Sequence, residues 1–187
     1  MRLFIALEIP KRSRKLISKK VDILKKNVEQ NIKWVSSDKW HITLKFLGKT
    51  DKKKIPFIKK YIEKAATNFT RFNLNFNTIG GFPHLNKPRV IYTGINNDRP
   101  KAINEFLENL LVKQDFKKDN KKYTPHLTIA RSRNNTNTQK LSKNLQKIIT
   151  SNFINVYMRA SKIVLYRSQL LPEGSKYNKL FEANLNK

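Results

Sequence analysis

The sequence predicts an α+β fold in which antiparallel sheets are backed by helices. Two kinds of segment alternate along the chain: amphipathic stretches with a helical spacing of apolar residues, and short runs with the two-residue repeat of a strand. The order of segments in the second half echoes that in the first. No linker long enough to separate independent domains interrupts the chain, so we expect residues 1–187 to form a single domain.

The first half of the chain is punctuated by proline and glycine. Pro10 stops an apolar run that we interpret as a buried strand, and Gly48 ends a later strand. Pro56 falls in the first turn of a helix, where a missing N–H costs little. The Gly- and Pro-rich segment 80–88 is expected to be a loop. The expected elements are strands over 3–9, 32–35, 41–48, 72–77 and 89–95, and helices over 11–29 and 52–68.

The second half begins with a helix whose apolar residues recur at helical spacing. A basic polar loop over 115–124 follows it, and a second polar loop over 134–138 is expected to be flexible. Alternating apolar residues near the end of the chain predict a run of strands. The expected elements are helices over 99–115 and 138–150, and strands over 125–131, 153–158, 162–170 and 177–185.

Two short stretches share one pattern. The first is His41-Ile42-Thr43-Leu44-Lys45-Phe46-Leu47-Gly48, and the second is Pro125-His126-Leu127-Thr128-Ile129-Ala130-Arg131. In a strand, residues i and i+2 share a face and lie roughly 7 Å apart. The His and Thr of each stretch therefore face one way, and their apolar neighbours face the core. Because the chain has only three histidines, we interpret the two strands as one site built from two similar halves.

Two histidines that face one cleft are able to divide acid–base work. An imidazole titrates near neutral pH, so one ring can remove a proton from an attacking oxygen while the other protonates a leaving oxygen. The hydroxyls of Thr43 and Thr128 can donate hydrogen bonds to a phosphoryl oxygen as charge builds on it. The pattern therefore indicates phosphodiester chemistry without a metal at His41, Thr43, His126 and Thr128.

Other interpretations of these histidines compete with catalysis. A single histidine on a strand is usually a satisfied polar group, and only the repetition of His-x-Thr favours a catalytic role. A zinc site is an alternative, but two histidines without cysteine or clustered carboxylates are a poor ligand set. We therefore expect no metal and no cofactor. His84, in the 80–88 loop, has no threonine two residues later and is expected on the surface.

The residues that follow each His-x-Thr are candidates for binding substrate. Strict alternation places Lys45 on the same face as His41, towards the cleft, although a solvated lysine is equally compatible with the pattern. The same alternation places Phe46 in the core. Arg131 has the wrong parity for the cleft, yet it can reach a phosphate if its strand ends near residue 130.

The composition limits the partners of the protein. Lys and Arg number 40 against 13 Asp and Glu, a formal net charge of +27, which favours an anionic partner, with nucleic acid first and a membrane surface second. The excess is spread along the whole chain, so compositional drift towards lysine explains it equally well. The chain has no cysteine, which excludes disulfides and cysteine-based zinc sites.

No segment of the sequence indicates export or membrane insertion. The first ten residues contain Glu8 and Pro10 and are too short for the apolar core of a signal peptide with its cleavage site. No apolar run approaches the roughly 20 residues of a membrane span. We expect a cytoplasmic protein, with a monomer as the default state.

Around these residues the sequence resembles a known family, the bacterial and archaeal RNA 2',3'-cyclic phosphodiesterases, also called 2'-5' RNA ligases, of the two-histidine (2H) phosphoesterase superfamily. The resemblance covers nearly the whole chain, and its ordered set of motifs is far more specific than His-x-Thr alone. The segments that carry it are Met1–Ala6, Lys33–Val35, Trp40–Gly48, Pro88–Tyr92, Tyr123–Arg131 and Leu165–Ser168 with the later Tyr177.

The resemblance implies two pseudo-symmetric lobes around a central cleft, with one His-x-Thr strand from each lobe. It implies that His41, Thr43, His126 and Thr128 open a terminal 2',3'-cyclic phosphate on RNA, such as a tRNA fragment, to a 2'-phosphate. By similarity, His126 is the proton acceptor that activates water and His41 is the proton donor to the leaving 3'-oxygen. The pseudo-symmetry leaves the reverse assignment open.

Two alternatives remain open at the level of sequence. The same fold serves a 2'-5' RNA ligase or a phosphodiesterase acting on 2'-5' oligonucleotides, and only a substrate panel separates these activities. A catalytically inactive RNA-binding module is an alternative of a different class. The feature against it is that both His-x-Thr pairs are intact.

Overall fold

The fold is built on one continuous antiparallel sheet in a computed structural model that describes residues 1–28, 31–149, 155–172 and 174–187. Across the described residues the strand order is β7-β4-β5-β6-β3-β1-β8-β9, and β2 pairs with β6. The strands are β1 (Arg2–Glu8), β2 (Ile32–Trp34), β3 (His41–Lys49), β4 (Phe72–Phe82), β5 (Val90–Ile95), β6 (His126–Ser132), β7 (Val156–Ala160), β8 (Lys162–Leu171) and β9 (Gly174–Asn184). The helices are α1 (Lys11–Asn27), α2 (Ile55–Asn68), α3 (Arg99–Leu111) and α4 (Thr138–Ile149).

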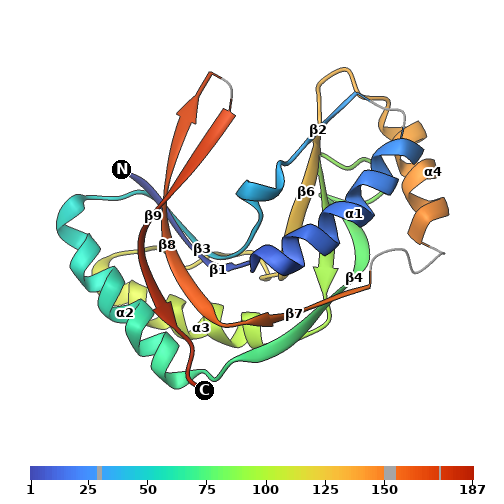
Figure 1. The fold of residues 1–187 in the computed structure, drawn as a ribbon. Coiled ribbons are helices and arrows are strands. Elements are labelled where there is room, and N and C mark those ends of the chain that lie inside the picture. Colours follow the sequence, from blue (N-terminus) through green and yellow to red (C-terminus); the bar gives the residue numbers. More distant parts are fainter. Residues whose placement is uncertain (29–30, 150–154, 173) are drawn as a thin grey trace.

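The sheet consists of two lobes that meet between β3 and β6. One lobe contains β1, β3, β8 and β9, and the other contains β4, β5, β6 and β7 with β2. Helices α2 and α3 pack on the first lobe, whereas α1 and α4 pack on the second. In Figure 1 the ends of β8 and β9 and the β2–β6 pair rise on the same side of the molecule. The predicted α+β fold with two similar lobes is therefore confirmed, and the two lobes share a single sheet.

The first strand is apolar on both faces because both faces are covered. Leu3, Ile5 and Leu7 belong to the main core, which the helices cover. Phe4 and Ala6 point to the other face, where they pack with Val164, Tyr166 and Tyr177 in a small separate cluster. The prediction of a buried strand here is therefore confirmed. The same strand also places Phe4 against the ring of His41.

The segment 80–88 was expected to be a loop, and this prediction is wrong for its first three residues. Strand β4 continues through Gly80 and Gly81 to Phe82 and pairs with β5 along this stretch. Gly80 lies opposite Tyr92, and a side-chain carbon at Gly80 would be 2.3 Å from the ring of Tyr92. The glycine allows a close approach within a sheet and does not mark a turn.

The other predicted elements are present, with shifts at their ends. Short 3-10 turns occupy the predicted start of the second helix, Lys52–Lys54, and the predicted end of the third, Val112–Gln114. The proline at position 56 lies in the first turn of α2, as expected. The last strand begins three residues early, at Gly174. The predicted helix ends at 29 and 150 and the predicted strand start at 153–154 lie outside the described residues.

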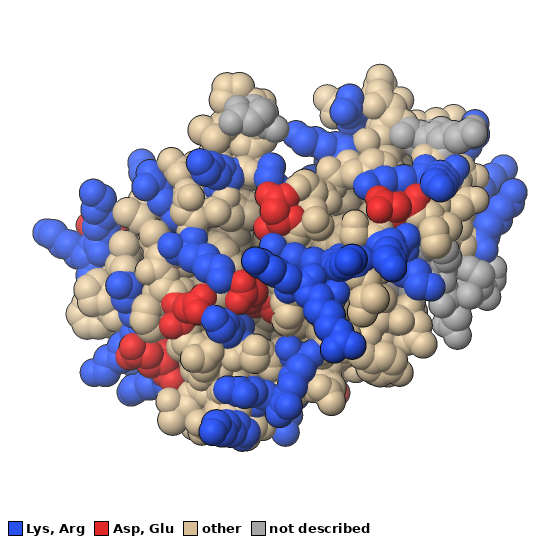
Figure 2. All heavy atoms as spheres, viewed as in Figure 1, with Lys and Arg blue, Asp and Glu red and all other residues tan. Residues whose placement is uncertain are grey.

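The surface is strongly basic over much of the molecule. Figure 2 shows Lys and Arg scattered over one face, with a continuous group over α1 and only small patches of Asp and Glu. None of the described helices is both long enough and apolar enough to cross a membrane. On the face shown in Figure 2, basic residues of this chain, whose net charge is +27, are therefore widespread, with a local concentration along one helix.

Candidate active site

The two His-x-Thr strands lie side by side at the junction of the lobes. Ile42 of β3 pairs with Leu127 of β6 in an antiparallel register. The neighbours of this pair therefore face each other across the two strands, His41 beside Thr128 and Thr43 beside His126. Side chains directly opposite in such a pair have Cβ atoms roughly 5 Å apart. Each histidine thus lies next to the threonine of the other half, and the local pseudo-twofold axis passes between the two buried aliphatic residues.

All four polar side chains line one pocket of about 190 Å³. The apolar residues between them, Ile42 and Leu127, are fully buried on the opposite face of the sheet, whereas the histidines and threonines are only partly buried. The rest of the pocket is contributed by both lobes. Its other lining residues are Val35, Lys39, Phe46, Phe82, Val90, Arg131 and Tyr177.

Both imidazoles are oriented by the same backbone hydrogen bond. Nδ1 of His41 lies 2.7 Å from the carbonyl oxygen of Lys39, and Nδ1 of His126 lies 2.7 Å from the carbonyl oxygen of Thr124. A carbonyl can only accept a hydrogen bond, so Nδ1 carries the proton in each ring. In the neutral form this leaves the lone pair of Nε2 free. The two rings therefore present equivalent nitrogens for proton transfer.

The environment keeps both histidines neutral in the free protein. Burial lowers the pKa of His41 to about 4, and the nearby His126, Arg14 and Arg131 act in the same direction. Burial also lowers the pKa of His126, again assisted by Arg131. Desolvation and adjacent positive charge both disfavour the imidazolium form. At neutral pH each ring is therefore a proton acceptor until an anion enters the pocket.

A β-bulge interrupts the alternation of both strands at the same point. In β3 the register against β1 shifts so that Ala6 pairs with Thr43 and Ile5 with Lys45. In β6 the register against β5 shifts so that Tyr92 pairs with Thr128 and Ile91 with Ala130. An extra residue in one strand turns the side chains beyond it to the opposite face. Strict alternation therefore fails immediately after each His-x-Thr.

The bulges overturn two predictions and resolve a third. Lys45 does not point towards the pocket but is buried, with 2% of its surface exposed. Phe46, expected in the core, is 65% exposed and lines the pocket. Arg131 lines the pocket as well, although its strand continues to Ser132, because the bulge corrects its parity. Phe46 and Arg131 occupy equivalent positions in the two halves.

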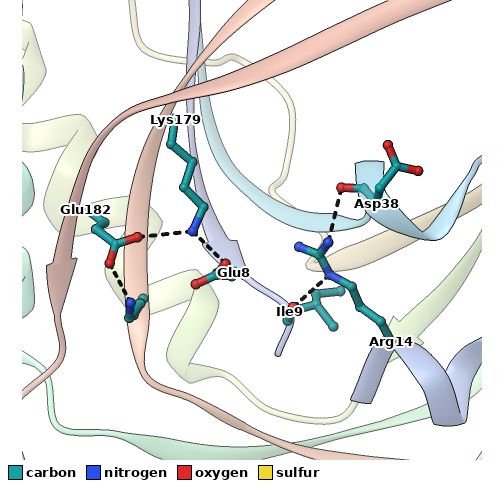
Figure 3. A network of polar contacts seen from close by, with 7 residues as sticks. Glu8, Ile9, Arg14, Asp38, Lys179 and Glu182 are labelled. Atoms are coloured by element: carbon teal, nitrogen blue, oxygen red, sulfur yellow. Dashed lines mark hydrogen bonds and ion pairs between the residues drawn. The ribbon is translucent and has the colours of Figure 1, made fainter. Parts of the chain in front are cut away.

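The arrangement beside His41 is fixed by a network of charged side chains, shown in Figure 3. Arg14, in the first turn of α1, donates hydrogen bonds to the carbonyl oxygens of Ile9 and Asp38 at 2.8 and 3.2 Å. Glu8, which lies opposite His41 in the sheet, is paired with Lys179 of β9 at 2.7 Å. The carboxylate next to the histidine is therefore already neutralised, and within this network Arg14 is the charge that acts on the ring.

Comparison with known proteins assigns the chain to a family. The family model described as the 2'-5' RNA ligase superfamily matches residues 21–170. The chain belongs to the 2'-5' RNA ligase superfamily.

Curated relatives within this superfamily match along nearly their full length. The protein named RNA 2',3'-cyclic phosphodiesterase in Methanocaldococcus jannaschii is 34% identical over 182 residues, which are 97% of this chain and 99% of that one. The protein of the same name in Thermotoga maritima is 31% identical over 183 residues, covering 97% and 94% of the two chains.

Solved structures agree with the superfamily fold. The crystal structure of TT0787 from Thermus thermophilus superposes with a TM-score of 0.80 at 22% identity and covers 99% of this chain and 98% of that one. The structure of LigT from E. coli complexed with 3'-AMP gives a TM-score of 0.76 at 19% identity, with 100% and 98% covered. At these identities the likeness establishes the fold.

Lys45 connects parts of the fold and does not line the pocket. Its ammonium lies 2.6 Å from Glu108 of α3 and 3.0 Å from Asp119, and it donates a hydrogen bond to the carbonyl oxygen of Lys117 at 2.9 Å. These three partners satisfy all three N–H groups. Asn104, also on α3, donates to the carbonyl oxygen of Leu44 at the bulge. The bulge thus fastens α3 and the 115–124 loop to β3.

Aromatic rings pack against both histidines. The sequence patterns did not identify these aromatic residues as part of the site. The ring of His41 lies 4.7 Å from Phe4 and 5.3 Å from Tyr177, between centroids. The ring of His126 lies 5.0 Å from Phe82 and 5.2 Å from Tyr92. These aromatics come from strands that neighbour the histidine strands or lie near them, so only the strand order identifies them as site residues. His84 is exposed, as expected.

No three His, Cys, Asp or Glu side chains of the described residues are grouped so that they could hold a metal ion. The two imidazoles instead share the pocket with the hydroxyls of Thr43 and Thr128, which can donate hydrogen bonds, and with the guanidinium of Arg131, which only donates. The donor set of the pocket therefore fits an anion.

We predict that the lowered pKa of His41 makes stability depend on pH. Between pH 6.5 and about 4 the unfolded chain binds a proton at this residue that the folded protein does not bind. The free energy of unfolding should therefore rise with pH in this window, and stability should be lost as the pH falls through it. Urea unfolding at a series of pH values measures the slope.

Replacement of the histidines separates this effect from general acid unfolding. The His41→Asn protein should have a smaller slope between pH 6.5 and about 4 than the wild type. The His84→Asn protein should keep the full slope, because His84 is exposed. An unchanged slope in the His41→Asn protein would contradict the prediction.

Proposed function

We propose that this chain is an RNA 2',3'-cyclic phosphodiesterase that hydrolyses terminal cyclic phosphates to 2'-phosphates without a metal ion. The observation that carries the proposal is the placement of two histidines and two threonines from two lobes in one pocket, each histidine beside the other half's threonine. The names of the curated relatives, matched over nearly the full length of both chains, support the same activity. Two intact halves argue against an inactive RNA-binding module.

The proposed reaction uses the free Nε2 atoms of the two rings. Nε2 of His126 removes a proton from a water molecule, whose oxygen attacks the phosphorus. The bond from phosphorus to the 3'-oxygen breaks, and His41 supplies the proton that this oxygen takes up. The product carries a 2'-phosphate and a free 3'-hydroxyl, and the histidines exchange their protonation states. General acid–base catalysis of this kind needs both groups within hydrogen-bond reach of the reacting oxygens.

The proposed acid must carry a proton before it can act. His41 is neutral in the free protein because its pKa is lowered to about 4. A phosphate anion between the rings favours the charged imidazole and raises this pKa. Substrate binding therefore prepares the acid, and the same reasoning applies to His126 if the roles are reversed. The two equivalent backbone hydrogen bonds are compatible with either assignment.

The remaining polar residues of the pocket stabilise negative charge in this proposal. The hydroxyls of Thr43 and Thr128 donate to the non-bridging phosphoryl oxygens, whose charge increases as water attacks. Arg131 lines the same pocket, and its guanidinium can bind a phosphate through two parallel hydrogen bonds. Lys45 is not part of this set, because its ammonium is buried against Glu108 and Asp119.

The experiment that tests the proposal is incubation of the purified protein with an RNA that ends in a 2',3'-cyclic phosphate, in the presence of EDTA. We expect turnover, with the phosphate of the product on the 2'-oxygen. A product with a 3'-phosphate would show that the 2'-oxygen is the leaving group. Loss of activity in EDTA would contradict a mechanism without a metal ion. Absence of any product would refute the proposed function.

A second activity is favoured by the family description itself. The matching model is that of the 2'-5' RNA ligase superfamily, and joining a 2',3'-cyclic end to a 5'-hydroxyl uses the same acid–base pair with a hydroxyl in place of water. Addition of a 5'-hydroxyl RNA to the same assay tests this ligation. Hydrolysis of 2'-5' oligonucleotides is tested in the same substrate panel.

We further propose a setting for this reaction. The basic surface and the phosphodiester chemistry are consistent with fragments of tRNA as substrates, and with a monomer that acts in the cytoplasm. Binding to RNA should weaken as salt rises, because phosphate contacts release counterions. Binding that stays constant from low to high salt would assign the charge of +27 to compositional drift.

A further inference from the structure

A groove outside the pocket lies between α1 and β7. It has a volume of about 630 Å³ and is lined from the helix by Arg12, Leu16 and Lys19, and from the strand by Tyr157 and Arg159. The charged residues among the described lining are all basic. Such a lining attracts a nucleic acid and an acidic protein surface alike, so the exposed apolar residues decide between these two partners.

The strand side of the groove presents an aromatic ring and a positive charge together. Strand β7 is the outermost strand of its lobe and pairs only with β4 among the described residues. Its alternation buries Val156, Met158 and Ala160 and turns Tyr157 and Arg159 to solvent. Tyr157 is 66% exposed. No ring of the described residues stacks on it, and a large exposed aromatic beside an arginine is a stacking platform for a nucleic-acid base.

The helix side adds two further cations around an apolar residue. Arg12, Leu16 and Lys19 recur at the spacing of one helical face, four and three residues apart. Leu16 is 43% exposed. Within the described residues no carboxylate pairs with Arg12, Lys19 or Arg159. The three charges are therefore available to phosphates, while the leucine and the tyrosine offer apolar contacts to bases.

The first turn of α1 relates the groove to the surroundings of His41. The first turn of α1 contributes Arg12 to the groove and, from the opposite side of the helix, Arg14, which acts on His41 and contacts Asp38. In Figure 2 the continuous group of Lys and Arg lies over this helix. The first turn of α1 thus carries one arginine that lines the groove and one whose charge acts on His41.

We propose that the α1–β7 groove binds a single-stranded segment of the RNA whose cyclic phosphate end occupies the active site. One base stacks on Tyr157, and the backbone phosphates contact Arg12, Lys19 and Arg159. The inference rests on the proposed function for its substrate class. A 2',3'-cyclic mononucleotide occupies only the pocket, whereas a longer RNA also contacts the groove. The groove therefore contributes to the binding of the longer substrate alone.

The test compares two substrates in the same variants. The Tyr157→Ala protein should lose roughly 5- to 100-fold in kcat/KM for a single-stranded oligoribonucleotide ending in a 2',3'-cyclic phosphate, the value of one stacked base. Its kcat/KM for a 2',3'-cyclic mononucleotide should not change. The Arg12→Gln/Arg159→Gln protein should show the same selectivity, and its salt dependence should fall by roughly one power of the salt concentration for each phosphate that is no longer neutralised.

Controls and a binding measurement make each outcome decisive. Lys60→Gln/Lys64→Gln removes two exposed charges from α2 in the other lobe and should leave both substrates unaffected. Equal losses on both substrates, or no loss on the long RNA, would overturn the inference. If the wild type turns over neither substrate, the proposed function fails. Equilibrium binding of a single-stranded RNA with a 3'-hydroxyl then tests the groove independently of catalysis. An unchanged affinity for this RNA in the Tyr157→Ala protein would show that the groove does not bind RNA.

Discussion

Replacement of His41 or His126 by alanine is expected to lower kcat for cyclic phosphate hydrolysis by roughly 10²–10⁴-fold, the usual contribution of a positioned acid or base. Each ring faces the pocket with the same free nitrogen, and His84, the third histidine of the chain, does not line the pocket and cannot replace either ring. The double variant should be little worse than either single variant, because residues that act as a unit have non-additive effects. Single-turnover rates on a cyclic phosphate RNA measure the losses.

A control and a stability measurement accompany these variants. The His84→Ala protein should retain full activity, because its side chain is exposed and away from the pocket. Since His41 packs on Phe4, thermal unfolding must show that the His41→Ala protein is folded at the assay temperature. Full activity in either folded single variant would exclude the paired mechanism.

A modified substrate identifies which histidine is the acid. A substrate with sulfur in place of the departing 3'-oxygen releases a thiolate, which needs little protonation because its conjugate thiol has a pKa of about 8.5. If His41 is the proton donor, this substrate should restore most of the rate lost in the His41→Ala protein and little of that lost in the His126→Ala protein. The opposite pattern would reverse the assignment, which the symmetry of the two strands allows.

Replacement of Lys45 by methionine is expected to lower the free energy of unfolding by about 3–5 kcal/mol, because the change leaves the carboxylate of Glu108 buried without its partner. Lys45 is 2% exposed, and the Glu108 side chain is 11% exposed. Asp119, which is 61% exposed, can return to solvent and should contribute little. Denaturant unfolding with a constant m-value measures the change.

Two further variants distinguish the loss of the pair from the loss of a lysine. The Lys49→Met protein alters an exposed lysine on the same strand and should change stability by less than about 0.5 kcal/mol. The Lys45→Met/Glu108→Gln protein should recover part of the loss, since it leaves no unpaired charge. A Lys45→Met protein as stable as the Lys49→Met protein would show that the buried contacts do not stabilise the fold.

The shared face of each His-x-Thr pair could be predicted for a local reason. His41 and Thr43, like His126 and Thr128, are two residues apart, and over that distance a strand has no room to change face. Four and five residues after His41, the same reasoning failed for Lys45 and Phe46, because a bulge lies between them and the threonine. The sequence of β3 contains no glycine or proline at the bulge that would have revealed it. The equivalent bulge in β6 brought Arg131 into the pocket.

The prediction of a loop over residues 80–88 was partly wrong for a related reason. Gly80 and Gly81 were interpreted through their usual role in turns, whereas the requirement at Gly80 is space for the ring of Tyr92 on the neighbouring strand. A glycine needed for a turn and a glycine needed for a close contact are identical in a single sequence. Only the pairing of β4 with β5, which joins residues distant along the chain, separates the two cases.

The order of amino acids was enough to predict most of the elements, the α+β class and the shared face within each His-x-Thr pair, because periodicity over a few residues depends on local backbone geometry alone. How the halves meet depends on the folded chain: the register of Ile42 with Leu127 sets each histidine beside the other half's threonine. The folded chain also places Lys45, Phe46 and Arg131, and it gathers the aromatic rings around each imidazole. These features depend on which strands become neighbours and where their registers shift, and contacts between distant parts of the chain set both.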